Sequence, residues 1–429
     1  MMYFSSPGRW LFKISVKVAL LLITSRAFVN IAKDDNVRER GALCGLIELG
    51  NKRATLALQT LTQNTDLADI LELNMTVSDE AWRNLFQHKT NKQNTREFPD
   101  DELGSHKDWK ERWNKWQAAA ETIFKSNGRQ TVLSKHKLQD LTTDQEAAIR
   151  PAVRRLAVAA TAIATAAEAQ APKSNLLTDT ELQTKLNKAI YGDEAGVEPP
   201  ADGTKLFTGA AGNGPQANCV GSTSTNKAVS VTAALLCLCT RQNGTGSNEG
   251  NACEYVTGTT QEWPGSTNYP NAAAISEAVK LCDLQTKHHV SAEMLAAKFV
   301  AVTRLIRRVS DAATFGKTIN GGCTGSQDCG MCVKYTDLGS DGSKKYTDIP
   351  WLGQLADPVT ALRADEKEVQ VHQQAADRIR TKRLQTQSPI YSESPQAREQ
   401  MQAKTSIPEK NKRQRMRATQ KQQNCLHRG

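Results

Sequence analysis

Aromatic residues are scarce in this chain of 429 residues, where Phe, Trp and Tyr together make up only 5%. The interior must therefore be built largely from Leu, Ile, Val and Ala. Small aliphatic side chains let helix axes approach closely, whereas a β-sandwich favours β-branched and aromatic residues. The composition predicts a mainly α fold, and the length suffices for one large domain or two ordinary ones.

The chain also lacks the sequence patterns of enzymes and metal sites. It contains no Gly-x-Ser-x-Gly, no His-Glu-x-x-His and no cysteine in a protease context. The glycine-rich segment 209–214 is not followed by Lys-Ser or Lys-Thr, so a nucleotide site is not indicated. The adjacent His288 and His289 are expected at the exposed end of a helix. We therefore expect no catalytic residue, no metal and no cofactor.

Acidic residues are absent from residues 1–27. This segment carries four basic side chains, an apolar run at 18–23 and the ending Ser-Arg-Ala, which is typical of a secretory signal peptide. In an oxidising compartment cysteines form disulfides. Cys323, Cys329 and Cys332 could also supply three ligands to a structural zinc ion, but the signal favours disulfides.

The net charge of +10 is concentrated at the two ends of the chain. Residues 1–27 contribute +4, and the tail 376–429 has thirteen Lys and Arg against four Asp and Glu, so residues 28–375 carry −3. A nucleic-acid-binding domain would show a basic face on its folded part. We expect no nucleic-acid partner, and we interpret 385–429 as a basic, disordered tail.

Hydrophobic periodicity predicts long helices that form a spine. Within 142–170 the apolar residues recur at alternating spacings of four and three, as in helix–helix seams, and Pro172 follows the segment. The comparable stripe in 33–62 suggests an antiparallel partner, and 361–384 is a third spine helix. The seam of 142–170 consists of Ile149, Val153, Leu156, Ala160, Ile163 and Ala167.

A fourth helix is predicted from the seam Leu295, Phe299, Val302, Ile306 and Val309. Around it, residues 190–350 are rich in glycine and hold most of the cysteines, so we predict a loop-rich head with little β structure, stapled by disulfides. Cys44 should bridge from the first helix into this head. The pairing is left open. The cysteines expected in disulfides are Cys44, Cys219, Cys237, Cys239, Cys253, Cys282, Cys323, Cys329 and Cys332.

Three tryptophans, Trp109, Trp113 and Trp116, recur at spacings of four and three. With cations interleaved, they could stack nucleic-acid bases. Such a stripe is far more typical of the buried face of an amphipathic helix, and we adopt that interpretation.

Two sequons, at Asn74 and Asn243, are candidate N-glycosylation sites in a secreted chain. Asn243 lies in an evidently exposed loop and is the safer site. Asn74 follows an apolar run and is expected to be partly covered.

Several of these segments together resemble the N-terminal domain of the trypanosome variant surface glycoproteins, B-type. The resemblance spans about 28–375 and rests on motifs in a fixed order. These are Ala42-Leu43-Cys44-Gly45-Leu46 on the first helix, the turn at 73–82, a cysteine strand at 235–239, and the run 323–335 followed by Ile349-Pro350-Trp351.

The resemblance implies a surface coat glycoprotein that shields the parasite membrane, undergoes antigenic variation and evades host antibodies. It also implies a homodimer or other homo-oligomer, and a glycosylphosphatidylinositol anchor on the outer face of the plasma membrane. Two alternatives are a surface nutrient receptor that binds a host protein on the same scaffold, and a non-functional truncated family member.

The C-terminal segment departs from the family pattern. After Cys332 only Cys425 remains, and the longest apolar run beyond residue 385 is two residues. Anchor attachment needs a hydrophobic tail of about 10–20 residues. From this segment alone we expect the chain as given not to be lipid-anchored.

Overall fold

The computed structural model describes residues 30–57, 61, 65–172, 175–196, 203–244, 252–253, 262–263 and 266–387. The predicted signal peptide and nearly all of the predicted basic tail lie outside these residues. The described fold is mainly helical, as predicted, and contains one four-stranded and one two-stranded sheet. The chain divides into two compact units, which are described separately.

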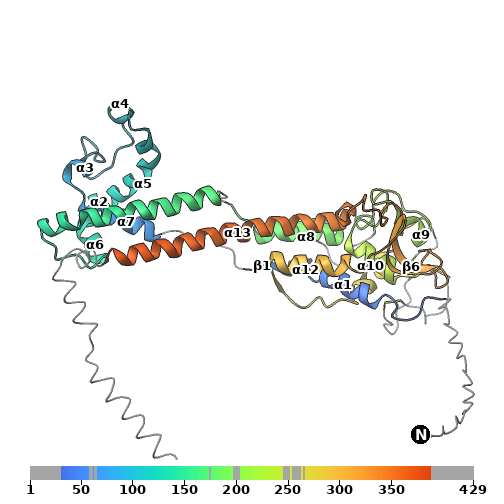
Figure 1. Cartoon of the computed structure of the whole chain (residues 1–429). Coiled ribbons are helices and arrows are strands. Elements are labelled where there is room, and N and C mark those ends of the chain that lie inside the picture. The colour runs from blue at the N-terminus through green and yellow to red at the C-terminus, as the bar shows by residue number, and fades with distance from the viewer. Residues whose placement is uncertain are drawn as a thin grey trace, which may run out of the picture. The chain divides into compact units, whose positions relative to one another are not determined.

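Unit 1 is formed by the ranges Met1–Thr55, Gln183–His288 and Met294–Asp357. Its core is centred on α10, in which all nine residues are buried, and α1 packs against that helix. A helix that is apolar on every side is stable only when it is buried. The helices, which Figure 1 labels except for α11 and η2, are α1 (Val37–Ile47), α9 (Gly214–Cys219), α10 (Val231–Cys239), α11 (Ala272–Val279), most of α8 (Asp179–Tyr191) and of α12 (Ala292–Thr303), the 3-10 helix η2 (Tyr346–Asp348) and the first turns of α13 (Pro350–Gln385).

The four-stranded sheet of unit 1 has the order β2-β6-β5-β4. Strand β6 pairs antiparallel with β5 and parallel with β2, and β4 pairs antiparallel with β5. The Ile-Pro-Trp motif follows this sheet: Pro350 is the first residue of α13, and Trp351 is buried and donates a hydrogen bond from Nε1 to Tyr335 Oη at 3.2 Å. The strands are β2 (Val220–Gly221), β4 (Arg307–Val309), β5 (Ala312–Thr318) and β6 (Gly330–Tyr335).

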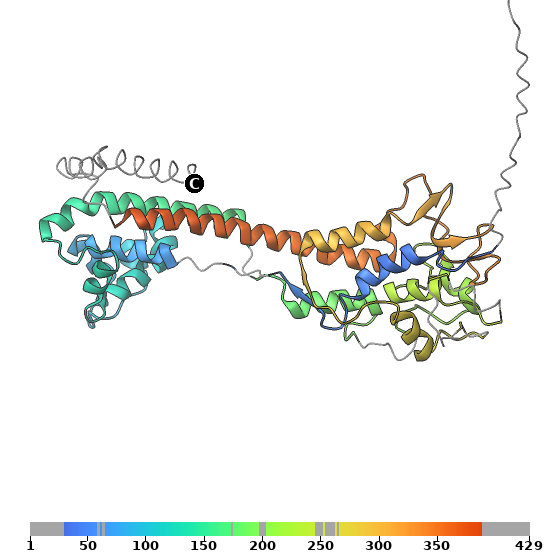
Figure 2. The ribbon, with the colours of Figure 1, turned by 90° about the horizontal axis from the view of Figure 1, so that it is seen from below.

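Unit 2 is formed by the ranges Leu56–Leu182, His289–Glu293 and Pro358–Gly429. Helix α2 packs against both α7 and α5, and Figure 2 shows it from a second side. One hydrophobic cluster joins α2, α5, α6 and α7 with Ile379 of α13. The helices of unit 2 are α2 (Thr65–Val77), α3 (Glu80–Asn84), α4 (Asp100–Leu103), α5 (Lys107–Phe124), α6 (Gly128–Lys135), α7 (Thr143–Gln170) and the larger part of α13. Strands β1 (Ala54–Leu56) and β3 (His288–Val290) form the two-stranded sheet.

Helix α7 occupies the segment for which the sequence predicts the Ala-rich seam. Thr142 begins it with a capping box, in which its hydroxyl accepts the Gln145 N–H and the Gln145 side chain accepts the Thr142 N–H. The buried face turns slightly from the predicted one, because Ala157 and Ala164 are buried while Leu156 and Ile163 are only half-buried. An ideal helix has 3.6 residues per turn, so its buried face drifts away from a strict 3.5-residue repeat.

The predicted first spine helix at 33–62 is wrong in extent and in partner. Helix α1 ends at Ile47, and Asn51 and Lys52 adopt positive φ angles of 51° and 63°, which a right-handed helix does not allow. A Cβ at Gly50 would lie 2.5 Å from the Tyr191 ring, so this turn requires glycine. The partner of α7 is α2, and the partner of α1 is α10.

Three other expectations about secondary structure are also wrong. The seam predicted to continue to Val309 leaves the helix at Thr303, and Val309 ends strand β4. Segment 235–239, taken as a strand, lies in helix α10. His288 and His289 belong to strand β3, where the backbone N–H of His288 donates to Arg53 O at 2.8 Å. Strand β3 pairs with β1, which is distant in sequence, β4 pairs with the adjacent β5, and α10 is buried on every side, so pairing and burial override the expected local structure.

Helix α5 has the amphipathic form expected for the tryptophan stripe. Trp113 is buried, stacks on Phe86 with ring centroids 4.4 Å apart, and donates from Nε1 to Arg96 O at 3.1 Å. Trp109 and Trp116 are half-buried against the edge of Trp82. The stripe is thus part of the packing of unit 2.

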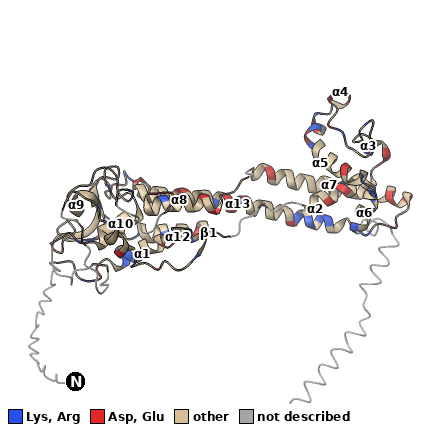
Figure 3. Ribbon diagram, turned by 180° about the vertical axis from the view of Figure 1, so that it is seen from behind, with Lys and Arg blue, Asp and Glu red and all other residues tan. Residues whose placement is uncertain are grey.

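Helix α13 becomes more basic towards its C-terminus. Arg363 and Lys367 lie among the acidic residues of its middle, whereas the charged residues after Asp377 are all basic, as the blue end of the helix in Figure 3 shows. Lys382 and Arg383 in the last turn interact favourably with the helix dipole.

Candidate functional site

The two candidate glycan acceptors lie in very different surroundings. Asn243 is exposed in a turn after α10. Backbone hydrogen bonds from Asn243 N to Trp263 O at 3.1 Å and from Trp263 N to Arg241 O at 2.7 Å hold this turn. Gly244 has φ +76°, a conformation that glycine adopts without strain. The Asn243 side chain is therefore presented to solvent, while Thr245 lies outside the described residues.

Asn74 lies within helix α2 and is half-buried. The two residues that complete its sequon, Met75 and Thr76, are buried. The Thr76 hydroxyl donates to Glu72 O at 2.8 Å. The sequon at Asn74 is therefore part of the core of unit 2, whereas that at Asn243 is at the surface.

Four disulfides, all in unit 1, join the cysteine-rich segments. Cys44 of α1 is bonded to Cys282 across a sequence separation of 238 residues. Cys237 and Cys239, both on α10, are bonded to Cys219 and Cys253 respectively. Residues two apart on a helix point in different directions, which is why α10 can fasten two different loops. The fourth bond joins Cys323 to Cys332.

Cys329 differs from the expectation that it forms a disulfide. It is a half-buried free thiol among the described residues. The structure joins the flanking Cys323 and Cys332 to each other, which removes the nearest partners. Cys425 lies outside the described residues.

Three buried asparagines fix the backbone of unit 1, and nothing in the sequence pattern marked them. Each amide group donates to two backbone carbonyls and accepts one backbone N–H. Asn36 donates to Leu238 O at 3.0 Å and Met331 O at 2.8 Å, and accepts Lys317 N–H at 2.7 Å. Asn218 and Asn226 make the equivalent sets. Where loops cross a core, side-chain amides of this kind bind the backbone N–H and C=O groups that regular secondary structure would otherwise pair.

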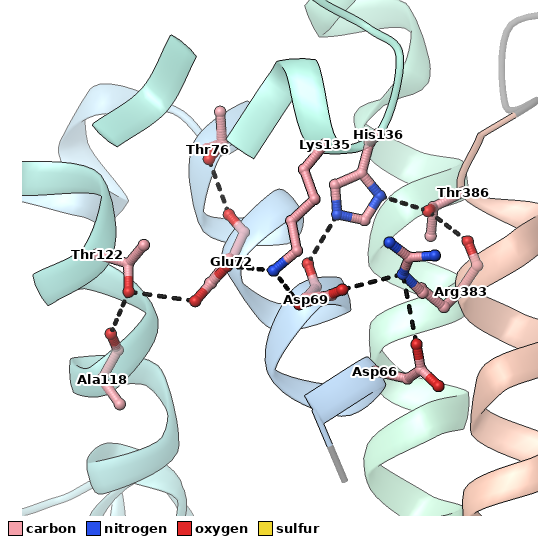
Figure 4. A network of polar contacts seen from close by, with 10 residues as sticks. All are labelled: Asp66, Asp69, Glu72, Thr76, Ala118, Thr122, Lys135, His136, Arg383 and Thr386. Atoms are coloured by element: carbon pink, nitrogen blue, oxygen red, sulfur yellow. Dashed lines mark hydrogen bonds and ion pairs between the residues drawn. The ribbon is translucent and has the colours of Figure 1, made fainter. Parts of the chain in front are cut away.

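A charged network in unit 2 ties the end of α13 to α2 and α6 (Figure 4). Arg383 Nε donates to Asp69 Oδ2 at 2.9 Å and lies 3.4 Å from Asp66, while Lys135 pairs with Asp69 on its other side. Only Asp69 of these two carboxylates is nearly buried, at 9% side-chain exposure. Three elements distant in sequence are thus joined through one carboxylate.

His136 completes this network and is fully buried. Its Nδ1 lies 2.7 Å from Thr386 Oγ1, and its Nε2 lies 3.1 Å from Asp69 O. Because a carbonyl oxygen can only accept, Nε2 carries a proton and donates it to Asp69 O. Burial, the largest influence, lowers the pKa of His136, although the Asp69 carboxylate acts in the opposite direction.

The described parts of the chain contain neither a cluster of metal ligands nor a helix that could span a membrane. No three His, Cys, Asp or Glu side chains converge there as a set of metal ligands. No helix in the described ranges combines the length and the apolar composition needed to cross a bilayer.

Comparison with known proteins yields consistent matches. A profile of the trypanosomal VSG domain matches residues 18–381. Variant surface glycoprotein ILTAT 1.23 of Trypanosoma brucei brucei is 26% identical over 361 residues, which cover 82% of this chain and 67% of that protein. Variant surface glycoprotein ILTAT 1.21 of the same organism is 23% identical over 308 residues, covering 68% and 59%. This chain therefore spans about three fifths to two thirds of the length of these relatives.

Proposed function

Since this chain belongs to the family of B-type trypanosomal variant surface glycoprotein domains, we propose that it is a coat glycoprotein of the trypanosome surface. Its action is steric: it covers the plasma membrane and acts on no substrate. The observation that carries this proposal is the family match over residues 18–381. The four disulfides of unit 1 support it, because they stabilise glycine-rich loops outside the cell.

Antigenic variation of this coat protein would act through its exposed loops. Exposed loops tolerate substitution because few of their side chains contribute to the core. In unit 1 the loops are held by disulfides and by buried asparagines, so their exposed positions are free to vary. Host antibodies are the partners that such variation evades.

Processing and assembly of the protein would follow the pattern of the family. Residues 1–27 are removed as a signal peptide, and 28–384 form the N-terminal domain of a longer surface protein with a basic segment after it. The protein assembles as a homodimer or other homo-oligomer. In whole family members a lipid anchor holds the protein at the outer face of the plasma membrane. Anchor and assembly are properties of whole family members, of which this chain spans a part.

Surface abundance tests the coat function. In trypanosomes expressing this gene as their only family member, live cells are biotinylated and surface proteins are quantified by mass spectrometry. A coat protein should dominate the labelled material, with permeabilised cells as the control for total expression. A product confined to the cell interior would contradict the proposal. A scarce surface product that binds a host protein saturably would favour the receptor alternative.

Glycan occupancy tests the proposed acceptors. Intact-mass measurement of secreted protein should show one N-glycan, removed by Asn243→Gln and unaffected by Asn74→Gln. Thr76 is buried in α2 and its hydroxyl is bonded to Glu72 O, so the Asn74 sequon is poorly placed for modification. An unchanged mass for Asn243→Gln would contradict the assignment.

A further inference from the structure

Three arginines converge on the C-terminal end of helix α2 in unit 2. They come from three segments: Arg83 from α3, Arg129 from α6 and Arg150 from α7. Arg83 Nη1 and Arg129 Nη2 each donate to the same oxygen, Thr76 O, at 3.3 Å. Two guanidinium groups thus share one carbonyl oxygen.

The third guanidinium is bonded to the next carbonyl along the chain. Arg150 Nε donates to Val77 O at 2.6 Å, and Arg83 Nη1 also donates to Ser78 O. The last carbonyls of a helix have no partner within the helix, so the three arginines complete the C-terminus of α2. Capping of α2 accounts for these hydrogen bonds to backbone carbonyls. Three guanidinium groups carry fifteen N–H donors, and capping uses only part of them.

Several donors remain unused among the described residues. Arg129 Nε is buried and has no hydrogen-bond partner there. Arg150 makes its described hydrogen bond through Nε alone, so its two Nη groups are available. The paired Nη N–H groups of a guanidinium match two oxygens of an oxyanion. The Nη groups therefore have the chemistry of an anion site, whereas the buried Arg129 Nε does not reach an ion that enters from solvent.

The local charge balance also favours an anion. One carboxylate, Glu146, pairs with the cluster directly, through Arg129 Nη2 at 2.9 Å. Glu80 acts on Arg83 over a longer distance and is exposed. Burial, followed by Arg129, lowers the pKa of Arg83, and Arg150 acts in the same direction. The positive charges of the cluster are therefore incompletely balanced by the described carboxylates.

We propose that Arg83, Arg129 and Arg150 form a binding site for a tetrahedral oxyanion, namely a phosphate or sulfate group. The side chain of Arg129 is 42% exposed, so the site is open to solvent on one side and can accept such a group as a free ion or as part of a larger molecule. Three guanidinium groups provide more donors than a carboxylate has oxygens, which favours the tetrahedral ions.

Binding of inorganic phosphate, inorganic sulfate and methyl phosphate is measured by isothermal titration calorimetry at constant ionic strength. We expect saturable binding with one site per chain. Arg129→Gln and Arg150→Gln should each raise the Kd at least tenfold. Arg154→Gln removes an exposed arginine one turn further along α7 and should leave the Kd within twofold. Binding of methyl phosphate as tightly as phosphate would indicate an esterified ligand, and weaker binding a free ion.

If no ligand binds saturably at concentrations up to 50 mM, the proposal is overturned. This limit is about five times a weak, millimolar-range Kd of 10 mM. Equal Kd values for wild type, Arg129→Gln and Arg154→Gln would also overturn the proposal, since binding would then be unspecific. Circular dichroism checks that each variant folds. If Arg129→Gln does not fold, Arg150→Lys carries the test, because it keeps the charge but loses the paired Nη donors.

Discussion

Replacing Asn36 by alanine should destabilise unit 1 far more than its size suggests. The side chain is fully buried, and its amide makes three hydrogen bonds, to Leu238 O, Met331 O and Lys317 N. Lys317 and Met331 are opposite one another in the β5–β6 register. Asn36 therefore joins the start of α1 to the sheet and to the end of α10.

The expected loss of stability in Asn36→Ala follows from the backbone groups that would be left without hydrogen-bond partners. Each buried polar group that loses its hydrogen bond costs about 1–3 kcal/mol. Three such groups, which are not additive because they share one side chain, amount to about 3–6 kcal/mol. A whole domain is stable by only about 5–15 kcal/mol. Asn36→Asp, which keeps the acceptor but loses both donors and buries a charge, should cost at least as much.

Hydrogen exchange measured by mass spectrometry isolates unit 1, because peptides covering β5 and β6 report on it directly. At about 1.4 kcal/mol per tenfold change, protection of these amides should fall by roughly 10² to 10⁴. Asn268→Ala is the matched control: that asparagine is exposed and donates to Ser266 Oγ at 3.1 Å, so its effect should stay below about 0.5 kcal/mol. A less than about threefold change in Asn36→Ala would refute the reasoning.

Three further outcomes are expected. Ala160→Glu places a charge at a fully buried position of α7 and should lower the free energy of unfolding by several kcal/mol. Ala162→Glu, on the exposed side of the helix, should leave the melting temperature nearly unchanged. Equal melting temperatures of the two variants would contradict the packing of α7. The pKa of His136 is lowered in the folded protein, so the side chain contributes its full stabilisation above about pH 6.5, which is the ordinary pKa of histidine. This stabilisation is lost as the pH falls through the lower pKa of the folded state. Thermal melts from pH 7 to 5 should therefore fall more steeply for wild type than for His136→Gln, and parallel curves would argue against a neutral buried histidine. Replacing both Cys44 and Cys282 by serine should lower the melting temperature more than replacing both Cys323 and Cys332. The two disulfides close loops of 238 and 9 residues, and the entropy cost of closing a loop grows with its length. A larger loss of melting temperature for the Cys323 and Cys332 variant would contradict this entropic account.

Features that depend on neighbouring residues could be predicted from the amino-acid sequence alone. The scarcity of aromatics predicted a mainly α fold, and the periodicity of 142–170 located α7, because the seam and the Thr142–Gln145 cap are local patterns. The turn at Asn243 was predicted to be exposed, since glycine and polar residues surround it. The order of the cysteine motifs indicated the family before any contact was known.

Which segments pack against one another depends on contacts between residues far apart in the chain. Helix α1 ends at Ile47, and Gly50, in the turn that follows, lies against Tyr191, a residue too distant in sequence for any local pattern to reveal. The partner of α7, the four disulfide pairs and the free thiol of Cys329 were likewise undetermined. The arginine cluster on α2 gathers three side chains from three helices. Each of these depends on long-range pairing, whose free energy is set by burial and hydrogen bonding in three dimensions and leaves no periodic signal in the chain.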